Sequence, residues 1–257
     1  MIYLKSPQEI AIMREGGIIL GDLLEIVLPD YIKEGVSGSH IDKVCEDYVL
    51  ARGAEPILKG YRVGGQVYRY SICFSMNNEV VHGLPTDSRV LKDGDLVGVD
   101  MSIRWKGYHL DKAVTYKVGN ISKENENLVD VTKKSLDLAL DCFVKGNRIS
   151  DISNSIQRFV ESNGMSIIRD FCGHGIGKNL HEDPEVLNYG EKDRGPLMED
   201  GMTLAIEPMV ALGDYHIFIE EDGWTASTLD GSNSAHFEET AALSKGLAHI
   251  LTRPGGR

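Results

Sequence analysis

Two stretches of the chain carry apolar residues at helical spacing and resemble each other. Residues 35–53 (GVSGSHIDKVCEDYVLARG) and 146–164 (GNRISDISNSIQRFVESNG) both place apolar side chains at positions i, i+4, i+7 and i+8. Both stretches also close with a glycine. This pattern predicts two amphipathic helices, each of which stops at its glycine.

A further helix is predicted before each of these two. The first runs from Ser6 to about Ile32 and is broken near Pro29, and the second runs from Lys123 to Lys145. Ser6 is followed three residues later by Glu9, which is the pattern of a capping box at a helix start. The helical part of the chain is therefore repeated.

The likeness continues into segments with the character of β-strands. KDGDLVGVDMSI (92–103) resembles EDGMTLAIEPMV (199–210), and HLDKAVTYKVG (109–119) resembles HFEETAALSKG (236–246), in the same order along the chain. We therefore predict an α+β fold in one domain, residues 1–257. Two pseudo-symmetric halves, about 1–120 and 121–257, would contribute helices and antiparallel strands, with the site between them.

The repeat aligns acidic residues within the apolar strand segments, Asp100 with Glu207 and Asp111 with Glu238. Taken singly, such a residue is most often a solvated turn residue. Four carboxylates converging from two halves would instead repel one another and require a counter-charge. With one histidine they form an oxygen-rich ligand set that suits a pair of divalent ions.

Two histidines lie in the glycine-rich stretch GHGIGKNLHEDP (173–184), which is a poor helix former. They are His174 and His181, and GHG alone could also be a tight turn with an exposed imidazole. The histidines without acidic partners in the pattern are expected to be structural or solvated; they are His40, His109, His216, His236 and His249.

Composition narrows the function classes. The net charge of −12 argues against a nucleic-acid or anionic-membrane partner, because such partners bind basic surfaces. Four widely spaced cysteines fit reduced thiols in a cytoplasmic protein. The start MIYLKSPQEIAIMREGG lacks the layout of a signal peptide, and no apolar run approaches the ~20 residues of a membrane helix. We expect a cytoplasmic protein.

At this point the motifs resemble a known family. FCGHGIGKNLHEDPEVLNY (171–189) is similar to the signature of type I methionine aminopeptidases, and NNEVVHGLP (77–85) and the strand segments above follow in the family's order. The resemblance covers essentially the whole chain. It implies the pita-bread fold, with two halves around a central antiparallel sheet. It also implies a dinuclear centre of Co, Mn, Fe or Zn whose ligands are Asp100, Asp111, His174, Glu207 and Glu238.

The same resemblance implies a reaction and a substrate. A metal-bridging water would attack the carbonyl after an N-terminal methionine when the second residue is small. Glu207 would take its proton, His181 would stabilise the oxyanion, and His82 would contact the leaving nitrogen. The methionine pocket would include Cys73, Trp224, Tyr61 and Tyr68. The expected partners are the N-termini of nascent polypeptides, near the ribosome. The protein is expected to be a monomer.

Three features depart from the family pattern. Residues 60–73 are longer than usual, and Gly64–Gly65 suggest a mobile loop over the pocket. Leu180 replaces a common phenylalanine. Lys112 stands where a small hydroxyl residue is common, so it either alters metal affinity or points to the opposite face of its strand.

Two alternatives stay open. Proline-directed aminopeptidases or dipeptidases of the same fold share the five ligands, but they usually carry a large extra N-terminal domain. Non-catalytic binding proteins of this fold have lost ligands that are all present here. The short segment between Glu207 and Glu238 favours the type I over the type II enzymes, which have a helical insertion there.

Overall fold

The helices lie where the apolar pattern predicts them. The computed structural model describes residues 1–255. Its helices are α1 (Pro7–Asp22), η1 (Leu23–Val27), η2 (Leu28–Asp30), α2 (Gly38–Leu50), α3 (Lys123–Cys142) and α4 (Ile149–Ser162). The capping box at Ser6 and Glu9 is confirmed, since each side chain accepts a hydrogen bond from the other residue's backbone. Positive φ angles at Gly53 and Gly164 follow the ends of α2 and α4.

The first predicted helix does not continue regularly to Ile32. After Asp22 the backbone forms a π-helical turn, η1, and then a 3-10 turn, η2, that contains Pro29. Proline cannot donate the hydrogen bond that a continuing α-helix needs, which agrees with the predicted break. The π-helical turn is not predicted from the sequence, and it lies behind the candidate site.

A nine-stranded sheet joins the two halves of the chain. Its strand order is β1-β6-β7-β16-β11-β9-β10, with β4 on β6 and β17 on β16, and every pairing is antiparallel. Its strands are β1 (Glu55–Pro56), β4 (Cys73–Met76), β6 (Leu96–Trp105), β7 (Tyr108–Lys117), β9 (Gly173–Gly175), β10 (Glu182–Val186), β11 (Thr203–Ile206), β16 (Glu238–Ser244) and β17 (Leu247–Ile250). The halves meet where β7 pairs with β16.

Three small sheets complete the fold. The first contains β15 (Ser234–His236), β12 (Met209–Ala211) and β8 (Ser166–Ile167). The second contains β13 (Ile217–Ile219), β14 (Ala226–Thr228) and β5 (Glu79–Val81). The third is the hairpin of β2 (Arg62–Val63) and β3 (Gln66–Val67). The second half differs here from the first. The segment matching the continuous β6 is split into β11 and β12 around Glu207 and Pro208, because proline has no N–H for the ladder.

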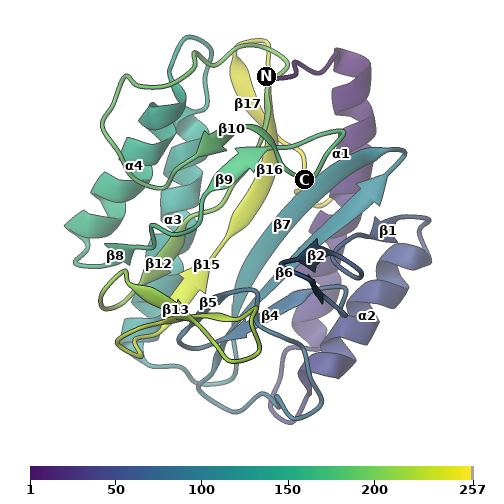
Figure 1. The fold of residues 1–257 in the computed structure, drawn as a ribbon, viewed down its shortest axis with the longest axis vertical. Helices are drawn as coiled ribbons and strands as arrows, with labels where there is room; N and C mark the ends of the chain where they lie inside the picture. The colour runs from purple at the N-terminus through teal and green to yellow at the C-terminus, as the bar shows by residue number, and fades with distance from the viewer. Residues whose placement is uncertain (256–257) are drawn as a thin grey trace.

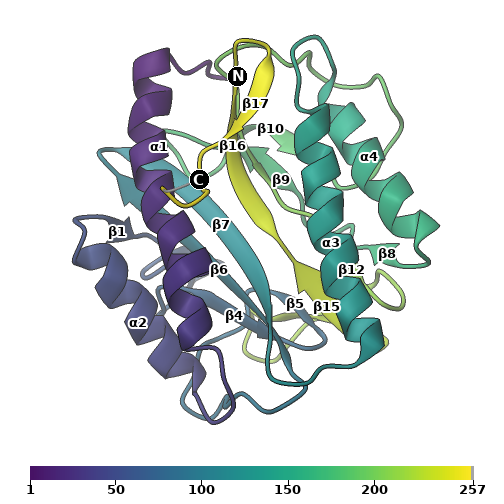
Figure 2. The ribbon, with the colours of Figure 1, turned by 180° about the vertical axis from the view of Figure 1, so that it is seen from behind.

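The helices cover one face of the large sheet, and the other face carries the cavity. Figure 2 shows α1 and α2 over the strands of the first half and α3 and α4 over those of the second. Each helix pair packs onto its own hydrophobic cluster, with Met13, Leu20 and Phe74 in one and Phe143 and Ile156 in the other. Figure 1 shows the small strands β2 and β13 on the opposite side. Among residues 1–255, no helix has both the length and the apolarity needed to cross a bilayer.

Candidate metal centre and active site

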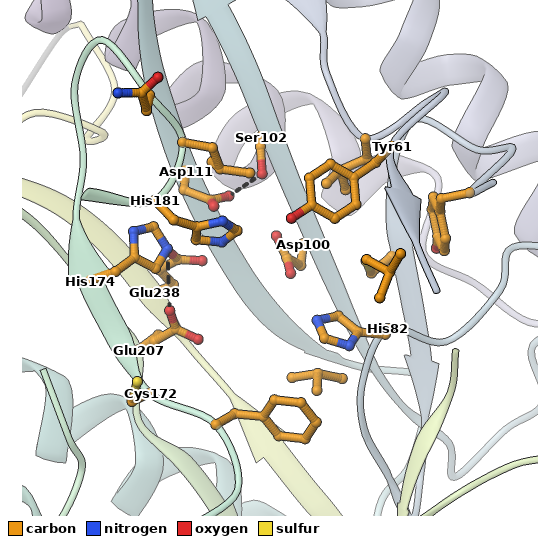
Figure 3. A pocket seen from close by; sticks show the side chains of 18 of the residues that line it. Tyr61, His82, Asp100, Ser102, Asp111, Cys172, His174, His181, Glu207 and Glu238 are labelled. Atoms are coloured by element: carbon orange, nitrogen blue, oxygen red, sulfur yellow. Dashed lines mark hydrogen bonds and ion pairs between the residues drawn. The ribbon is translucent and has the colours of Figure 1, made fainter. Parts of the chain in front are cut away.

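A cavity of about 880 Å³ opens on the helix-free face of the large sheet. All five predicted ligands line it, as do His82, His181 and the four predicted pocket residues. Figure 3 shows the carboxylates and imidazoles pointing toward one another from both halves of the chain.

Strand register explains why three of the carboxylates meet. Asp100 on β6 and Glu238 on β16 both stand opposite Ala113 of β7, so they flank one small residue on the same face of the sheet. Asp111 precedes Ala113 by two residues and therefore points to that face as well. Ser102, the cross-strand partner of Asp111, donates a hydrogen bond from its Oγ to Asp111 Oδ1 at 2.8 Å. The alternation of these strands places the three carboxylates together.

His174 and Glu207 complete the group from the second half. His174 stands on β9 opposite Ala205 of β11, and its Nδ1 lies 2.9 Å from the carbonyl oxygen of Gly175. A proton on Nδ1 leaves the Nε2 lone pair free for a metal. Nε2 points into the cavity, 3.7 Å from Glu207 Oε1. Glu207 follows β11, and Asn188 donates a side-chain hydrogen bond to its carbonyl oxygen at 2.9 Å.

The charges of this group are unbalanced without a cation. Burial, reinforced by neighbouring carboxylates, raises the pKa of Asp100, Glu207 and Glu238 well above the usual range. Burial also raises the pKa of Asp111 to about 6. Asp100 Oδ1 and Glu238 Oε1 are buried and have no hydrogen-bond partner among the described residues.

These residues fit a site for divalent metal. One ligand atom each from Asp111, His174 and Glu238 lies within 4.8 Å of the others. Burial lowers the pKa of His174 to about 4, so the ring is neutral at pH 7, as a ligand must be. Four carboxylates with one imidazole form an oxygen-rich donor set suited to Mn, Fe or Co. The two orphaned oxygens are the acceptors that such ions would satisfy.

The predicted non-ligand histidines lie on two sides of this group. The ring of His181 stands edge-on to that of His174, with centroids 4.5 Å apart. His82, at a positive φ of 61°, faces the cavity across from the carboxylates and packs edge-on to Phe171 at 5.3 Å. Burial lowers the pKa of His82 to about 4, and partial desolvation lowers that of His181. Both imidazoles are neutral near pH 7.

A third non-ligand histidine, His236, was not assigned to the site by sequence reasoning. It is predicted to be structural or solvated, but it is 4% exposed and lines the cavity. Its Nε2 is buried without a hydrogen-bond partner among the described residues and lies 3.9 Å from Glu207 Oε2. Spacing along the chain indicates this position, because His236 precedes the predicted ligand Glu238 by two residues and residues two apart in a strand point to the same face.

The four predicted methionine-pocket residues also border the cavity. Tyr68 packs edge-on to Trp224 at 5.1 Å, and its hydroxyl donates to the carbonyls of Ile72 and Gly83, so its ring is held in place. Cys73 stands opposite Asp100 in the β4–β6 register, which joins the pocket wall to a predicted ligand. Tyr61 stands edge-on to His181 at 6.5 Å. Further lining residues that the sequence did not single out are Leu58, Val81, Phe171 and Leu180.

The departures from the family pattern have definite positions. Residues 62–67 form the hairpin β2–β3, whose turn residues Gly64 and Gly65 both have positive φ. This hairpin contacts the second half of the chain at the edge of the cavity. Gln66 packs so closely on Gly223 that a Cβ added to Gly223 would lie 2.6 Å from Gln66 Nε2. Lys112 points away from the cavity, to the opposite face of β7, where it forms ion pairs with Glu239 and Glu25.

Comparisons with known proteins agree with this geometry. Residues 11–245 match the model of metallopeptidase family M24. A methionine aminopeptidase of Clostridium perfringens is 45% identical over 254 residues, which cover 98% of this chain and 99% of that protein. The crystal structure of a methionine aminopeptidase from Thermotoga maritima superposes with a TM-score of 0.95 at 42% identity and covers 98% of this chain and 100% of that one.

A more distant structure shares the fold alone. A prolidase from Pyrococcus horikoshii has a TM-score of 0.77 at 20% identity, with coverage of 98% of this chain and 63% of that one. The prediction of a pita-bread fold around an antiparallel sheet is confirmed. A family model that spans most of the chain, together with whole-length homologues, shows that this chain belongs to metallopeptidase family M24, as a homologue of the methionine aminopeptidases.

Proposed function

We propose that this chain removes the N-terminal methionine from polypeptides whose second residue is small. The observation that carries the proposal is the convergence of five ligand-type residues, with two orphaned carboxylate oxygens, beside an apolar and aromatic pocket. The homologues that share its whole length are named methionine aminopeptidases, which supports the same reaction.

Two divalent ions would be held by the side chains of the predicted ligand set, Asp100, Asp111, His174, Glu207 and Glu238. When bound, such ions supply an acidified water and polarise the scissile carbonyl. The oxygen-rich donor set favours Mn, Fe or Co, with Zn as a further candidate. Ser102 would hold Asp111 in its ligating orientation through the 2.8 Å hydrogen bond between them.

Glu207 would accept the proton of the attacking water, because its carboxylate lies at the edge of the ligand group and faces the cavity. His181 would donate a hydrogen bond to the oxygen of the attacked carbonyl as negative charge develops there. Its neutral imidazole, held against the ring of His174, is suited to that role. His82, on the other side of the cavity, would contact the peptide nitrogen that leaves.

Methionine would bind between Tyr61, Tyr68, Cys73 and Trp224, whose rings and thiol form the less polar side of the cavity. The free amine of the substrate must reach the ligand group while the scissile carbonyl faces His181. The second side chain then points toward the wall near His82 and His181, where a long side chain would collide. We infer that only small second residues are accepted.

The alternatives are less well supported. A proline-directed peptidase shares the fold, but the prolidase likeness is at 20% identity, against 45% for a methionine aminopeptidase. A non-catalytic binding protein would not need all five ligand-type side chains in one cavity.

We further propose that the substrates are nascent polypeptides, that the enzyme is a monomer, and that it acts in the cytoplasm without binding nucleic acid or membrane. All four cysteines are free thiols, which is typical of proteins in reducing compartments. The acidic net charge of −12 disfavours polyanionic partners.

Release of methionine from short peptides tests the proposal. The protein, freed of metal by chelation and then given Mn²⁺ or Co²⁺, is expected to cleave Met-Ala-Ser and Met-Gly peptides rapidly and Met-Lys or Met-Phe peptides slowly or not at all. The N-formylated form of Met-Ala-Ser is the matched control, because formylation removes the amine lone pair. Equal rates for both forms, or full activity with no metal present, would contradict the proposal.

A further inference from the structure

Lys112 is a cation buried directly behind the candidate metal centre. Its side chain is 2% exposed, and its Nζ lies 2.5 Å from Glu239 Oε1 and 3.1 Å from Glu25 Oε1. The second oxygen of Glu239 accepts a hydrogen bond from the hydroxyl of Thr252. A lysine is rarely buried to this degree unless it is paired, and here two carboxylates surround it.

The ion pair is in register with the predicted ligands. Lys112 follows Asp111 on β7, Glu239 follows Glu238 on β16, and Lys112 and Glu239 stand directly opposite each other across these strands. Successive side chains of a strand point to opposite faces. The ligand-type carboxylates therefore point into the cavity, and the Lys112–Glu239 pair joins the same two strands from behind.

The third partner comes from an irregular helix. Glu25 lies in the π-helical turn η1, which follows α1 and packs against β7 on the side away from the cavity. The hydroxyl of Tyr116, also on β7, donates a hydrogen bond to the carbonyl oxygen of Leu24 in the same turn. Single π-helical turns are rare and occur often at functional sites. Here the turn places a carboxylate on Lys112 from the helix side.

Resting on the proposed function, we propose that Lys112 and Glu239 are positioning residues for the metal centre. By joining β7 to β16 behind Asp111 and Glu238, the pair holds the two ligands at the spacing that metal binding requires. The two residues contact neither metal nor substrate.

Metal affinity distinguishes this role from two others. If the pair positions the ligands, Lys112→Met and Glu239→Gln each weaken metal binding. If it acts only through its charge, the two substitutions have opposite effects, because removing a nearby positive charge tightens cation binding and removing a negative charge weakens it. If the pair serves only the stability of the fold, neither substitution changes the affinity of the folded protein.

The experiment is a calorimetric titration of metal-free protein with Mn²⁺ alone. Lys112→Met and Glu239→Gln are each expected to raise the Kd of the tighter site by about 10-fold or more, as loss of supporting residues around metal ligands commonly does. The double variant leaves neither charge without its partner, but it is still expected to bind Mn²⁺ more weakly than the parent, because the link between β7 and β16 is absent. The remaining Glu25 has a side chain that is 30% exposed and can be hydrated. Lys117→Met, at the exposed end of β7, is the matched control.

Each outcome decides the question. Unchanged affinity in both single variants, or changes of opposite sign, would overturn the proposal. If Lys112→Met does not fold, Glu239→Asp carries the test, because it keeps the charge but withdraws the carboxylate from Lys112, which keeps its contact with Glu25. Weaker binding in Glu239→Asp would then support positioning, and unchanged binding would overturn it. Circular dichroism and thermal melting of the metal-free variants establish that folded protein is titrated. Absence of Mn²⁺ binding to the parent protein would instead count against the proposed function.

Discussion

Glu207 lies between two imidazoles. His236 Nε2 is 3.9 Å from its Oε2, and His174 Nε2 is 3.7 Å from its Oε1. His174 is a predicted ligand, whereas His236 is fixed from behind, since its backbone N–H donates to Thr115 Oγ1 at 2.9 Å. The Nε2 of His236 is buried and has no hydrogen-bond partner among the described residues. One imidazole nitrogen therefore lies near each carboxylate oxygen of Glu207.

We predict that His236→Ala lowers kcat by about 10-fold and leaves the fold intact, because Glu207 loses the neighbour of its second oxygen. His236→Gln, which retains an amide donor, is expected to retain more activity than the alanine variant. Steady-state kinetics on Met-Ala-Ser provide the measurement, with the exposed His216→Ala as control. Equal kcat values for all four proteins would mean that His236 only fills space.

Glu207→Gln is expected to lower kcat by at least 10²-fold while the fold is retained. An amide of the same shape cannot accept the proton of the attacking water, and it is also a weaker metal ligand. Kinetics are to be measured with metal restored, and circular dichroism compared with the parent protein. A variant that turns over like the parent would show that Glu207 is neither base nor essential ligand.

His181→Ala is expected to lower kcat about 10²–10³-fold with a smaller change in KM, because a hydrogen bond to the developing oxyanion is strongest in the transition state. The exposed His249→Ala, on the distant β17, is the control for general effects of losing an imidazole. Unchanged kcat in the His181 variant would assign it a structural role only.

The start of α1 predicts a dependence of stability on pH. Hydrogen bonds from Tyr108 and from the backbone and hydroxyl of Ser6 lower the pKa of Glu9 from 4.5 to about 2. A lowered folded-state pKa contributes stability above the unfolded value, and this contribution is lost as the pH falls from about 4.5 toward 2. Urea denaturation should therefore find Glu9→Gln less stable than the parent at pH 6 and nearly equal near pH 2. An equal difference at both pH values would contradict this, and the exposed Glu34→Gln is the control.

Sequence pattern was sufficient for the parts of this protein that depend on local rules. Helical spacing located α2 and α4, and strand alternation placed Asp100 and Asp111 on one face of neighbouring strands. The internal repeat correctly predicted that the second half would bring Glu238 to the same place. These features follow from short-range periodicity, which a single sequence contains.

Features that depend on long-range contacts were not predictable in this way. The π-helical turn forms where Glu25 meets Lys112, a residue far away in the chain. Nothing in the strand pattern around Lys112 indicates which acidic residues will pair with it. The repeat does not mark His236 as a site residue, and its place in the cavity depends on contacts with both halves of the chain. The partner of Lys5 is also distant in sequence, and this contact carries a further prediction.

Lys5 and Glu182 form a second buried ion pair, next to His181. Lys5 Nζ lies 2.5 Å from Glu182 Oε2, and their side chains are 5% and 4% exposed. Glu182 Oε1 accepts a hydrogen bond from the backbone N–H of Asn179 at 3.0 Å, so its carboxylate closes the turn that carries His181. Lys5 also packs tightly on this turn, because an added Cβ at Gly177 would lie 2.3 Å from its Cε.

We predict that Lys5→Met lowers kcat by about 10-fold, with a smaller effect on KM, because the turn no longer holds His181 at the substrate carbonyl. Breaking a buried pair on one side also costs about 3–5 kcal/mol of folding free energy, so kcat must be expressed per folded molecule.

The double variant Lys5→Met/Glu182→Gln leaves no unpaired charge and should regain stability. It should not regain full kcat, because an amide accepts the Asn179 hydrogen bond less strongly than a carboxylate does. Lys33→Met, at an exposed position, is the control. A kcat that stays at the parent value in Lys5→Met, once corrected for unfolded protein, would limit this ion pair to stabilising the fold.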